Sequence, residues 1–189
     1  MTVMRWDLSY LKCAVASLGA SMVFLTSAAA DPAELEALLE GLQTAEPGAA
    51  EQIEGRIYEI WSQSGSPSMD LLLERGRKAL EDGNTPRAIE HFSALIDHAP
   101  AFAEGYNGHA TAYFRDGRYG LSLEDIRRTL ELNPNHFGAM TGLALILEEL
   151  GETNGALLAW REVERLHPNR EGLSDSIRRL EVMIGGETL

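Results

Sequence analysis

Apolar residues recur along most of this chain at the three- and four-residue spacing of α-helices. The clearest stretch covers residues 171–184, where apolar side chains form one stripe and charged side chains lie between them. This stripe consists of Leu173, Ile177, Leu180 and Ile184. Residues 31–42 and 48–65 have the same amphipathic character, the first with four leucines and the second with isoleucines and a tryptophan. The pattern therefore predicts an all-α chain.

A longer period of 34 residues runs through the middle of the chain. Glycine and proline recur at this distance, and between them so do one small and one large residue. The glycines are Gly83, Gly117 and Gly151, and the prolines are Pro100, Pro134 and Pro168. The small residues are Ala88, Ser122 and Ala156, and the large ones are Phe92, Ile126 and Trp160. Three copies in one register indicate a repeated structural unit.

Each of these positions has a role in a pair of antiparallel helices. Glycine readily adopts the positive φ angle at which a helix ends and the chain turns. The small residue lets two helices approach closely, the large residue fills the groove towards the next helix, and proline stops the second helix. The spacing predicts three helix pairs over 69–102, 103–136 and 137–170. A capping helix and tail follow over 171–189, because a stack of repeats needs a polar outer face at its end.

This pattern resembles the tetratricopeptide repeat. The family's small residue in its first helix, its alanine–aromatic pair in the second helix and its terminal proline match Gly76, Ala88, Phe92 and Pro100. The second copy departs from the pattern, with a serine and an isoleucine in place of the alanine–aromatic pair. The resemblance implies a right-handed superhelical stack of antiparallel helix pairs, an α-solenoid. More loosely, the chain is similar to short exported repeat proteins of Gram-negative bacteria.

A further helical hairpin is predicted ahead of the repeats, over residues 31–68. Aligned on the 34-residue register, residues 35–68 place Tyr58 in the position of the large residue. Leu42 and Glu54 occupy the positions that small residues take in the other copies. We therefore interpret this hairpin as divergent and only repeat-like.

The first 30 residues have the organisation of an export signal. Arg5 and Lys12 precede an uncharged stretch over 13–30, which ends in three alanines. We expect cleavage after Ala30; the alternative is an uncleaved membrane anchor, because this stretch just reaches spanning length. Cys13, the only cysteine, lies inside the stretch, so the mature protein would contain no thiol. A lysine directly before Cys13 does not suit a lipoprotein signal.

The charge of the chain argues against polyanionic partners. The formal net charge is −13, and residues 31–189 contain 14 basic and 28 acidic residues, a net charge of −14. Such a surface repels phosphate backbones and anionic lipid headgroups. We therefore expect no nucleic-acid partner, and no membrane association once the signal is removed.

No constellation in the sequence predicts catalysis, a metal site or a cofactor. The histidines show no metal-ligand spacing, and we interpret them as surface or turn residues. They are His91, His98, His109, His136 and His167. Acidic neighbours such as Glu148 and Glu149 are interpreted as a solvated helix face. We expect Trp61 and Trp160 to be packing residues rather than an aromatic binding cage.

The resemblance implies that the first helices of the repeats line the inner wall of the superhelix. The candidate partner-binding residues on this wall are Arg77, Asn107, Thr111, Phe114, Arg115 and Leu145. A mixed wall of this kind suits an extended or helical peptide. The alternative is an inner wall that is merely solvated. The basic carboxylate clamp of some relatives is incomplete here, because the third repeat carries Thr141 and Leu145 where basic residues would be expected.

The sequence thus predicts a non-enzymatic, exported scaffold that binds an envelope protein in its concave groove, in the periplasm or outside the cell. The rival is an inner-membrane-anchored accessory factor that retains residues 13–30. A third alternative is an enzyme or ion-binding protein that uses the histidines. The identity of the protein or peptide partner and the oligomeric state do not follow from the sequence.

Overall fold

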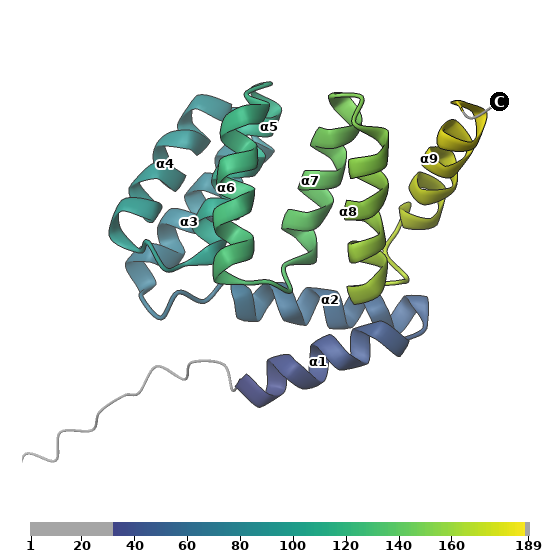
Figure 1. The fold of residues 1–189 in the computed structure, drawn as a ribbon. Coiled ribbons are helices and arrows are strands. Elements are labelled where there is room, and N and C mark those ends of the chain that lie inside the picture. Colours follow the sequence, from purple (N-terminus) through teal and green to yellow (C-terminus); the bar gives the residue numbers. More distant parts are fainter. Residues whose placement is uncertain (1–31, 188–189) are drawn as a thin grey trace, which may run out of the picture.

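The computed structural model describes residues 32–187, which form nine α-helices and no strand (Figure 1). An N-terminal hairpin consists of α1 (Pro32–Thr44) and α2 (Pro47–Trp61). Three helix pairs follow: α3 (Pro67–Glu81) with α4 (Thr85–His98), α5 (Ala103–Arg115) with α6 (Tyr119–Leu132), and α7 (Phe137–Glu149) with α8 (Thr153–Leu166). The last helix is α9 (Leu173–Glu187). None of these helices is long and apolar enough to span a membrane. The predicted export signal lies outside the described residues.

The three pairs stand side by side as antiparallel hairpins, which confirms the predicted repeat architecture (Figure 1). Each pair turns at its repeat glycine, and Gly83, Gly117 and Gly151 have φ angles of +73°, +72° and +74°. The residue after each glycine donates its backbone N–H to a carbonyl five residues earlier, as from Asn84 to Ala79 at 2.8 Å. These left-handed turns end the first helix of each pair and start the second at once.

A single aromatic ring shows why glycine is needed where neighbouring pairs meet. The side chain of Phe92 in α4 is fully buried and lies between Gly76 of α3 and Gly108 of α5. A Cβ atom added at Gly76 would lie 2.5 Å from the ring, and one added at Gly108 would lie 2.4 Å from it. Both distances are shorter than carbon atoms tolerate, so the two glycines let three helices close around the ring.

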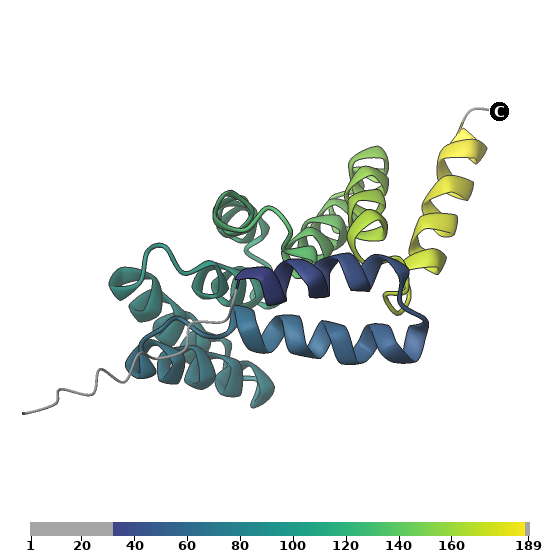
Figure 2. The ribbon, with the colours of Figure 1, turned by 90° about the horizontal axis from the view of Figure 1, so that it is seen from below.

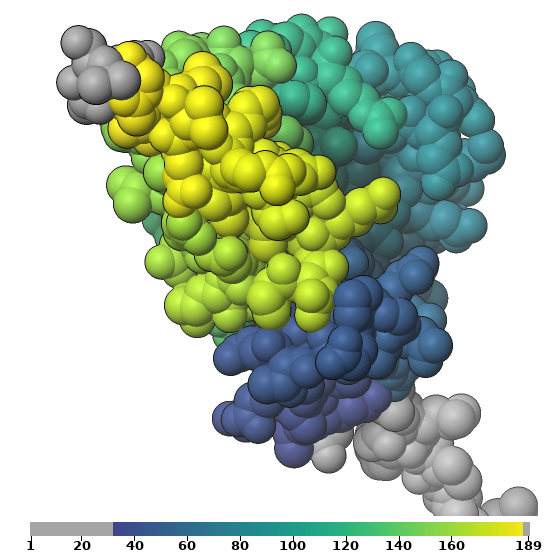
Figure 3. All heavy atoms as spheres, turned by 90° about the vertical axis from the view of Figure 1, so that its right-hand side faces the viewer, coloured from purple at the N-terminus to yellow at the C-terminus, as the bar shows by residue number. Residues whose placement is uncertain are grey.

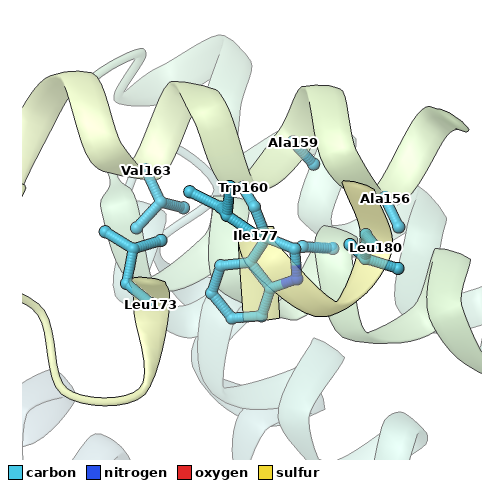
Figure 4. Packing of buried hydrophobic residues seen from close by; sticks show 8 residues of the cluster. Ala156, Ala159, Trp160, Val163, Leu173, Ile177 and Leu180 are labelled. Carbon is cyan, nitrogen blue, oxygen red and sulfur yellow. The ribbon is translucent and has the colours of Figure 1, made fainter. Parts of the chain in front are cut away.

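The C-terminal helix α9 covers the last repeat with its apolar stripe. Leu173, Ile177 and Leu180 of α9 pack against Trp160 and Val163 of α8 (Figure 4). Figure 3 shows α9, in yellow, over the end of the stack, with α1 and α2 in dark blue below it. The side chain of Trp160 is 5 % exposed, so it is a packing residue, as predicted. The helix caps the solenoid by burying a face that would otherwise meet water.

The N-terminal hairpin crosses the lower ends of the helix pairs instead of stacking on α3 (Figures 1 and 2). Trp61 and Tyr58 of α2 pack against Phe137 at the start of α7, with ring centroids 5.0 and 5.4 Å away. Leu42 of α1 and Leu166 of α8 belong to the same apolar cluster. Residues 32–61 are therefore held mainly by the third repeat, although the first repeat follows them in the chain.

The enclosure of Phe92 predicts a cost for adding one methyl group. We expect Gly108→Ala to lower the free energy of unfolding by about 1–3 kcal/mol, because the ring is blocked on its other side by Gly76. The control is Gly55→Ala in α2, where an added Cβ meets no atom within 4 Å. This control should raise the free energy of unfolding by about 0.5–1 kcal/mol, since alanine favours the helix. Urea unfolding measures the free energy of unfolding of both variants. Equal changes in the two variants would contradict the enclosure of the Phe92 ring.

Candidate partner-binding groove

A hollow of about 290 Å³ opens between α5 and α7 on the inner side of the repeats. Small and large residues both line it. The small ones are Ala110, Ser122, Gly138, Ala139 and Gly142, and the larger ones are the buried Ile126 and Ile146 together with Asn107, Thr111, Phe114, Arg115, Thr141 and Leu145. Small residues on two neighbouring helices leave room that a side chain of a bound molecule could fill. We call this space the α5–α7 hollow.

Five of the six predicted groove residues line the α5–α7 hollow. Four of them lie on α5 at positions 107, 111, 114 and 115, which face one side of a helix, and Leu145 lies opposite on α7. The side chain of Leu145 is 39 % exposed. The guanidinium of Arg115 is held in place because its Nη1 donates to the backbone oxygen of Leu80, 2.6 Å away. The hollow thus presents an apolar surface beside an oriented cation.

The sixth predicted residue, Arg77, stands apart from the other five. Its guanidinium donates to Oε2 of Glu104 at 2.6 Å and to Oγ of Ser62 at 2.8 Å. Ser62 directly follows α2, so these bonds join the N-terminal hairpin to the first two repeats. The structure therefore gives the Arg77 side chain structural partners within the chain.

Glu104 is the centre of a buried polar network that the sequence did not reveal. Its side chain is 2 % exposed, and its Oε1 lies 2.6 Å from Nε2 of His136. Nδ1 of His136 accepts the backbone N–H of Ala139 at 3.0 Å, so Nε2 carries the proton that is donated to Glu104. Burial alone raises the pKa of Glu104, but the bonds from His136 and the charge of Arg77 outweigh it. The pKa of Glu104 lies below its usual value as a result.

A second network ties α2 to the end of α8. Glu54 of α2 lies 3.0 Å from Nε2 of His167 and accepts a bond of 2.8 Å from Nη1 of Arg170. The hydrogen bond from His167 is the main reason that the pKa of Glu54 is lowered; burial opposes this shift, and the charge of Arg170 adds to it. Glu54 thus acts as a docking residue for the third repeat.

The interpretation of the histidines as surface or turn residues is wrong for His109, which is buried within α5, whereas His136 and His167 do lie at turns. All three are buried and lie beside carboxylates. His136 and His167 do follow helix ends, but the N-terminal hairpin covers those ends and takes them out of water. His109 instead faces the preceding repeat, where its Nε2 lies 3.2 Å from Oγ of Ser93.

The interpretation of Glu148 as a solvated side chain also needs correction. Its side chain is 15 % exposed, accepts the Nε1–H of Trp160 at 2.6 Å and pairs with Arg179 at 2.6 Å. These bonds tie the end of α7 to α8 and α9. Glu148 thus supports the packing of Trp160, whose apolar neighbours are drawn in Figure 4.

The N-terminal hairpin closes the lower end of the inner surface. The hydroxyl of Tyr58 would lie 2.6 Å from a Cβ atom added at Gly138, a residue that lines the α5–α7 hollow. Burial raises the pKa of Tyr58 to about 12. The chain's own α2 therefore occupies the region around the start of α7, and the open part of the hollow lies further along α5 and α7.

Stacked helix pairs with a hollow between their first helices define a helical-repeat protein. A tetratricopeptide repeat family model matches residues 73–124 and 107–171, so the chain belongs to the tetratricopeptide repeat family. A TPR repeat-containing protein of Rhizobium etli is 32 % identical over 141 residues, which cover 75 % of this chain and 69 % of that protein. The resemblance drawn from the repeat glycines, alanines and prolines is thereby confirmed.

Solved structures of the same fold include domains with peptide ligands. The first TPR of Spaghetti (RPAP3) bound to the HSP90 peptide SRMEEVD superposes with a TM-score of 0.59 at 21 % identity, covering 62 % of this chain and 93 % of that one. The Sgt2 TPR domain from Aspergillus fumigatus superposes with a TM-score of 0.60 at 20 % identity, covering 65 % and 83 %. At these identities the likeness shows the fold.

The buried network around Glu104 predicts a stability loss that depends on pH. Glu104→Gln should lower the free energy of unfolding at pH 7 by about 1.5–3 kcal/mol, because it weakens bonds to Arg77 and His136. A carboxyl with a lowered pKa stabilises the fold above its unfolded pKa, here 4.5, and loses this effect as the pH falls through the folded pKa. The variant should therefore lose less stability than the wild type between pH 5 and pH 3.

Urea unfolding at a series of pH values measures this difference. The control is Glu162→Gln, which removes a carboxylate that is 58 % exposed and pairs with Arg165 on the surface of α8. We expect this control to change the free energy of unfolding by less than about 0.5 kcal/mol. If the two variants behave alike, the Glu104 network does not stabilise the fold.

Proposed function

We propose that this protein is a non-enzymatic scaffold of the bacterial cell envelope that binds a peptide segment of a partner protein in the α5–α7 hollow. The main support is the convergence of Asn107, Thr111, Phe114, Arg115 and Leu145 on one open hollow. The N-terminal hairpin and α9 cover other faces of the repeats and leave this one accessible. The hollow is thus the best candidate for a docking surface on the inner side.

The chemistry of the hollow favours an extended or helical peptide. The side-chain amide of Asn107 can donate to and accept from a peptide backbone. Phe114 and Leu145 suit an apolar side chain that packs beside the glycines and alanines of the hollow. Arg115 adds a cation for a carboxylate on the same segment. The Spaghetti domain, whose solved structure contains an HSP90 peptide, gives this proposal support from the same fold.

The envelope location depends on the first 30 residues. With cleavage after Ala30, the protein is periplasmic or secreted, and the repeats meet their partner in solution. If residues 13–30 are retained, the repeats are an inner-membrane-anchored accessory factor that recruits partners to the bilayer. The acidic residues in the rest of the chain disfavour direct binding to anionic lipid in either case.

The mass of the mature protein distinguishes these two locations. We expect intact-mass spectrometry of the protein from the envelope fraction to give a chain that begins at Asp31, because the three alanines before it suit signal cleavage. A chain that keeps residues 13–30 and fractionates with the inner membrane would establish the anchored alternative.

Partner binding in the hollow predicts that a new charge there abolishes capture of the partner. Leu145→Glu places a carboxylate beside the apolar residues that line the hollow, so proteins captured by the wild type from an extract of the source cells should be lost or reduced at least tenfold. The matched control is Leu158→Glu, because Leu158 lies on α8, is 70 % exposed and is not among the residues that line the hollow.

Quantitative mass spectrometry of the captured proteins measures the effect. The control should retain the wild-type set of partners, and circular dichroism should show that both variants are folded. If Leu145→Glu and Leu158→Glu capture the same proteins as the wild type, the partner binds elsewhere on the scaffold.

A further inference from the structure

The second and third repeats each bury one face against the repeat that precedes them, and the first repeat has the equivalent face. Shifted by 34 residues, Arg75 corresponds to His109, which lies 3.2 Å from Ser93 of the preceding pair. Lys78 corresponds to Ala112 in the second repeat and to Ile146 in the third, and the side chains of both are fully buried. Arg75 and Lys78 therefore stand at positions where one repeat stacks on another. We call this face of α3 and α4 the first edge.

No element of the described chain stacks on the first edge as a preceding repeat would. In the sequence the N-terminal hairpin comes directly before α3, but it runs beneath the helix pairs, mainly against the third repeat (Figures 1 and 2). The packing neighbours of α3 are α4 and α5. A surface built to receive a helix is thus left open at this end, whereas α9 covers the other end.

The first edge is basic although the chain is acidic. Arg75, Lys78, Arg87 and His91 line one hollow of about 520 Å³, together with a single carboxylate, Asp82. The ammonium of Lys78 pairs with Asp82 at 2.6 Å. The guanidinium groups of Arg75 and Arg87 form no ion pair within residues 32–187. Two unpaired cations and a histidine therefore gather on one face of a protein whose formal net charge is −13.

We propose that the first edge is a second docking surface, which receives an acidic helical segment of a partner protein. The segment would lie where the second helix of a preceding repeat would pack, with carboxylates directed at Arg75 and Arg87. Helix-on-helix stacking is the geometry that this face already has in the later repeats. The cations at these positions select an acidic segment through charge complementarity. Apolar residues at the same positions would instead favour stacking of any helix.

A second copy of this chain suits the first edge less well than an acidic partner. The outer side of α9 would meet the edge in a head-to-tail stack, but the charged side chains described between residues 173 and 186 already have partners of opposite charge. Arg178 pairs with Asp175, and Glu181 pairs with Arg161 of α8. A second copy with its net charge of −13, or a nucleic acid, would bring many negative charges against the rest of the acidic surface, whereas a single acidic helix brings its carboxylates to the cations of the first edge alone.

A labelled helical peptide tests the proposal directly. The probe is an 18-residue alanine-based peptide with glutamates at i, i+4 spacing, and its counterpart has glutamine in their place. We expect fluorescence anisotropy at low salt to show binding of the glutamate peptide, weakened at least tenfold in the glutamine peptide and by added salt. Arg75→Ala/Arg87→Ala should weaken binding at least fivefold, and circular dichroism should show an unchanged fold, since both side chains are exposed.

The matched control is Arg165→Ala/Arg178→Ala, which makes the same change in net charge on α8 and α9 and should alter affinity less than twofold. Leu145→Glu should also leave this peptide's binding within twofold, so a failure of the first edge is distinguishable from a failure of the α5–α7 hollow. The proposal is wrong if the glutamate peptide does not bind, or if the two double variants weaken it equally. It is also wrong if a DNA duplex binds more tightly than the peptide, or if the edge cations instead support self-association of the protein.

Discussion

One buried carboxylate, Glu104, joins the two residues on which the end of the N-terminal hairpin rests. This side chain binds Arg77 of α3 and His136 at the start of α7, while the His136 ring stacks on Trp61 with centroids 4.5 Å apart. A buried carboxylate without partners would be strongly destabilising. The helix α5, which carries Glu104, must therefore meet α3 and the start of α7 in an arrangement that brings both partners to it. Because Arg77 also binds Ser62, the end of α2 is held from two sides. Together with the Glu54 network and the apolar cluster around Phe137, these contacts hold the hairpin across the repeats rather than beside them.

This placement divides the surface of the solenoid into covered and open faces. The hairpin takes up the lower ends of the repeats, and α9 takes up the face of the last repeat. The α5–α7 hollow and the first edge remain open, and they differ in chemistry. The hollow is lined by small and apolar residues with some polar side chains and one arginine, whereas the first edge is mainly charged. An apolar anchor suits the hollow and an acidic helix suits the edge, so the same segment would not fit both.

The repeats could be predicted because they follow from one local period, and the five residues of the α5–α7 hollow because the resemblance to the tetratricopeptide repeat assigns inner-wall positions within that period. Once Gly83, Gly117 and Gly151 set the register, the resemblance places residues such as Asn107 and Phe114 on the inner wall. The buried pairs could not be predicted, because Glu54 and His167 are 113 residues apart and no spacing connects them. Their only signal is that His136 and His167 lie beside the repeat prolines, at turns that share one end of the stack. Nothing in the sequence near those turns indicates that α2 would cover them. For the same reason the sequence did not indicate that Arg77 would bind Ser62 at the end of α2.

The two proposed surfaces are held on one framework, which has a consequence for affinity. Arg115, at the rim of the hollow, donates to the backbone oxygen of Leu80 in α3, the helix that also carries Arg75 and Lys78. Around Phe92, α3, α4 and α5 are closely packed, so the distance between the hollow and the first edge is set by a rigid core. A partner with a peptide anchor for the hollow and an acidic helix for the edge would bind the second surface intramolecularly once the first is engaged. Two weak contacts of different chemistry would then combine into one selective interaction, provided that the segment joining them spans the distance.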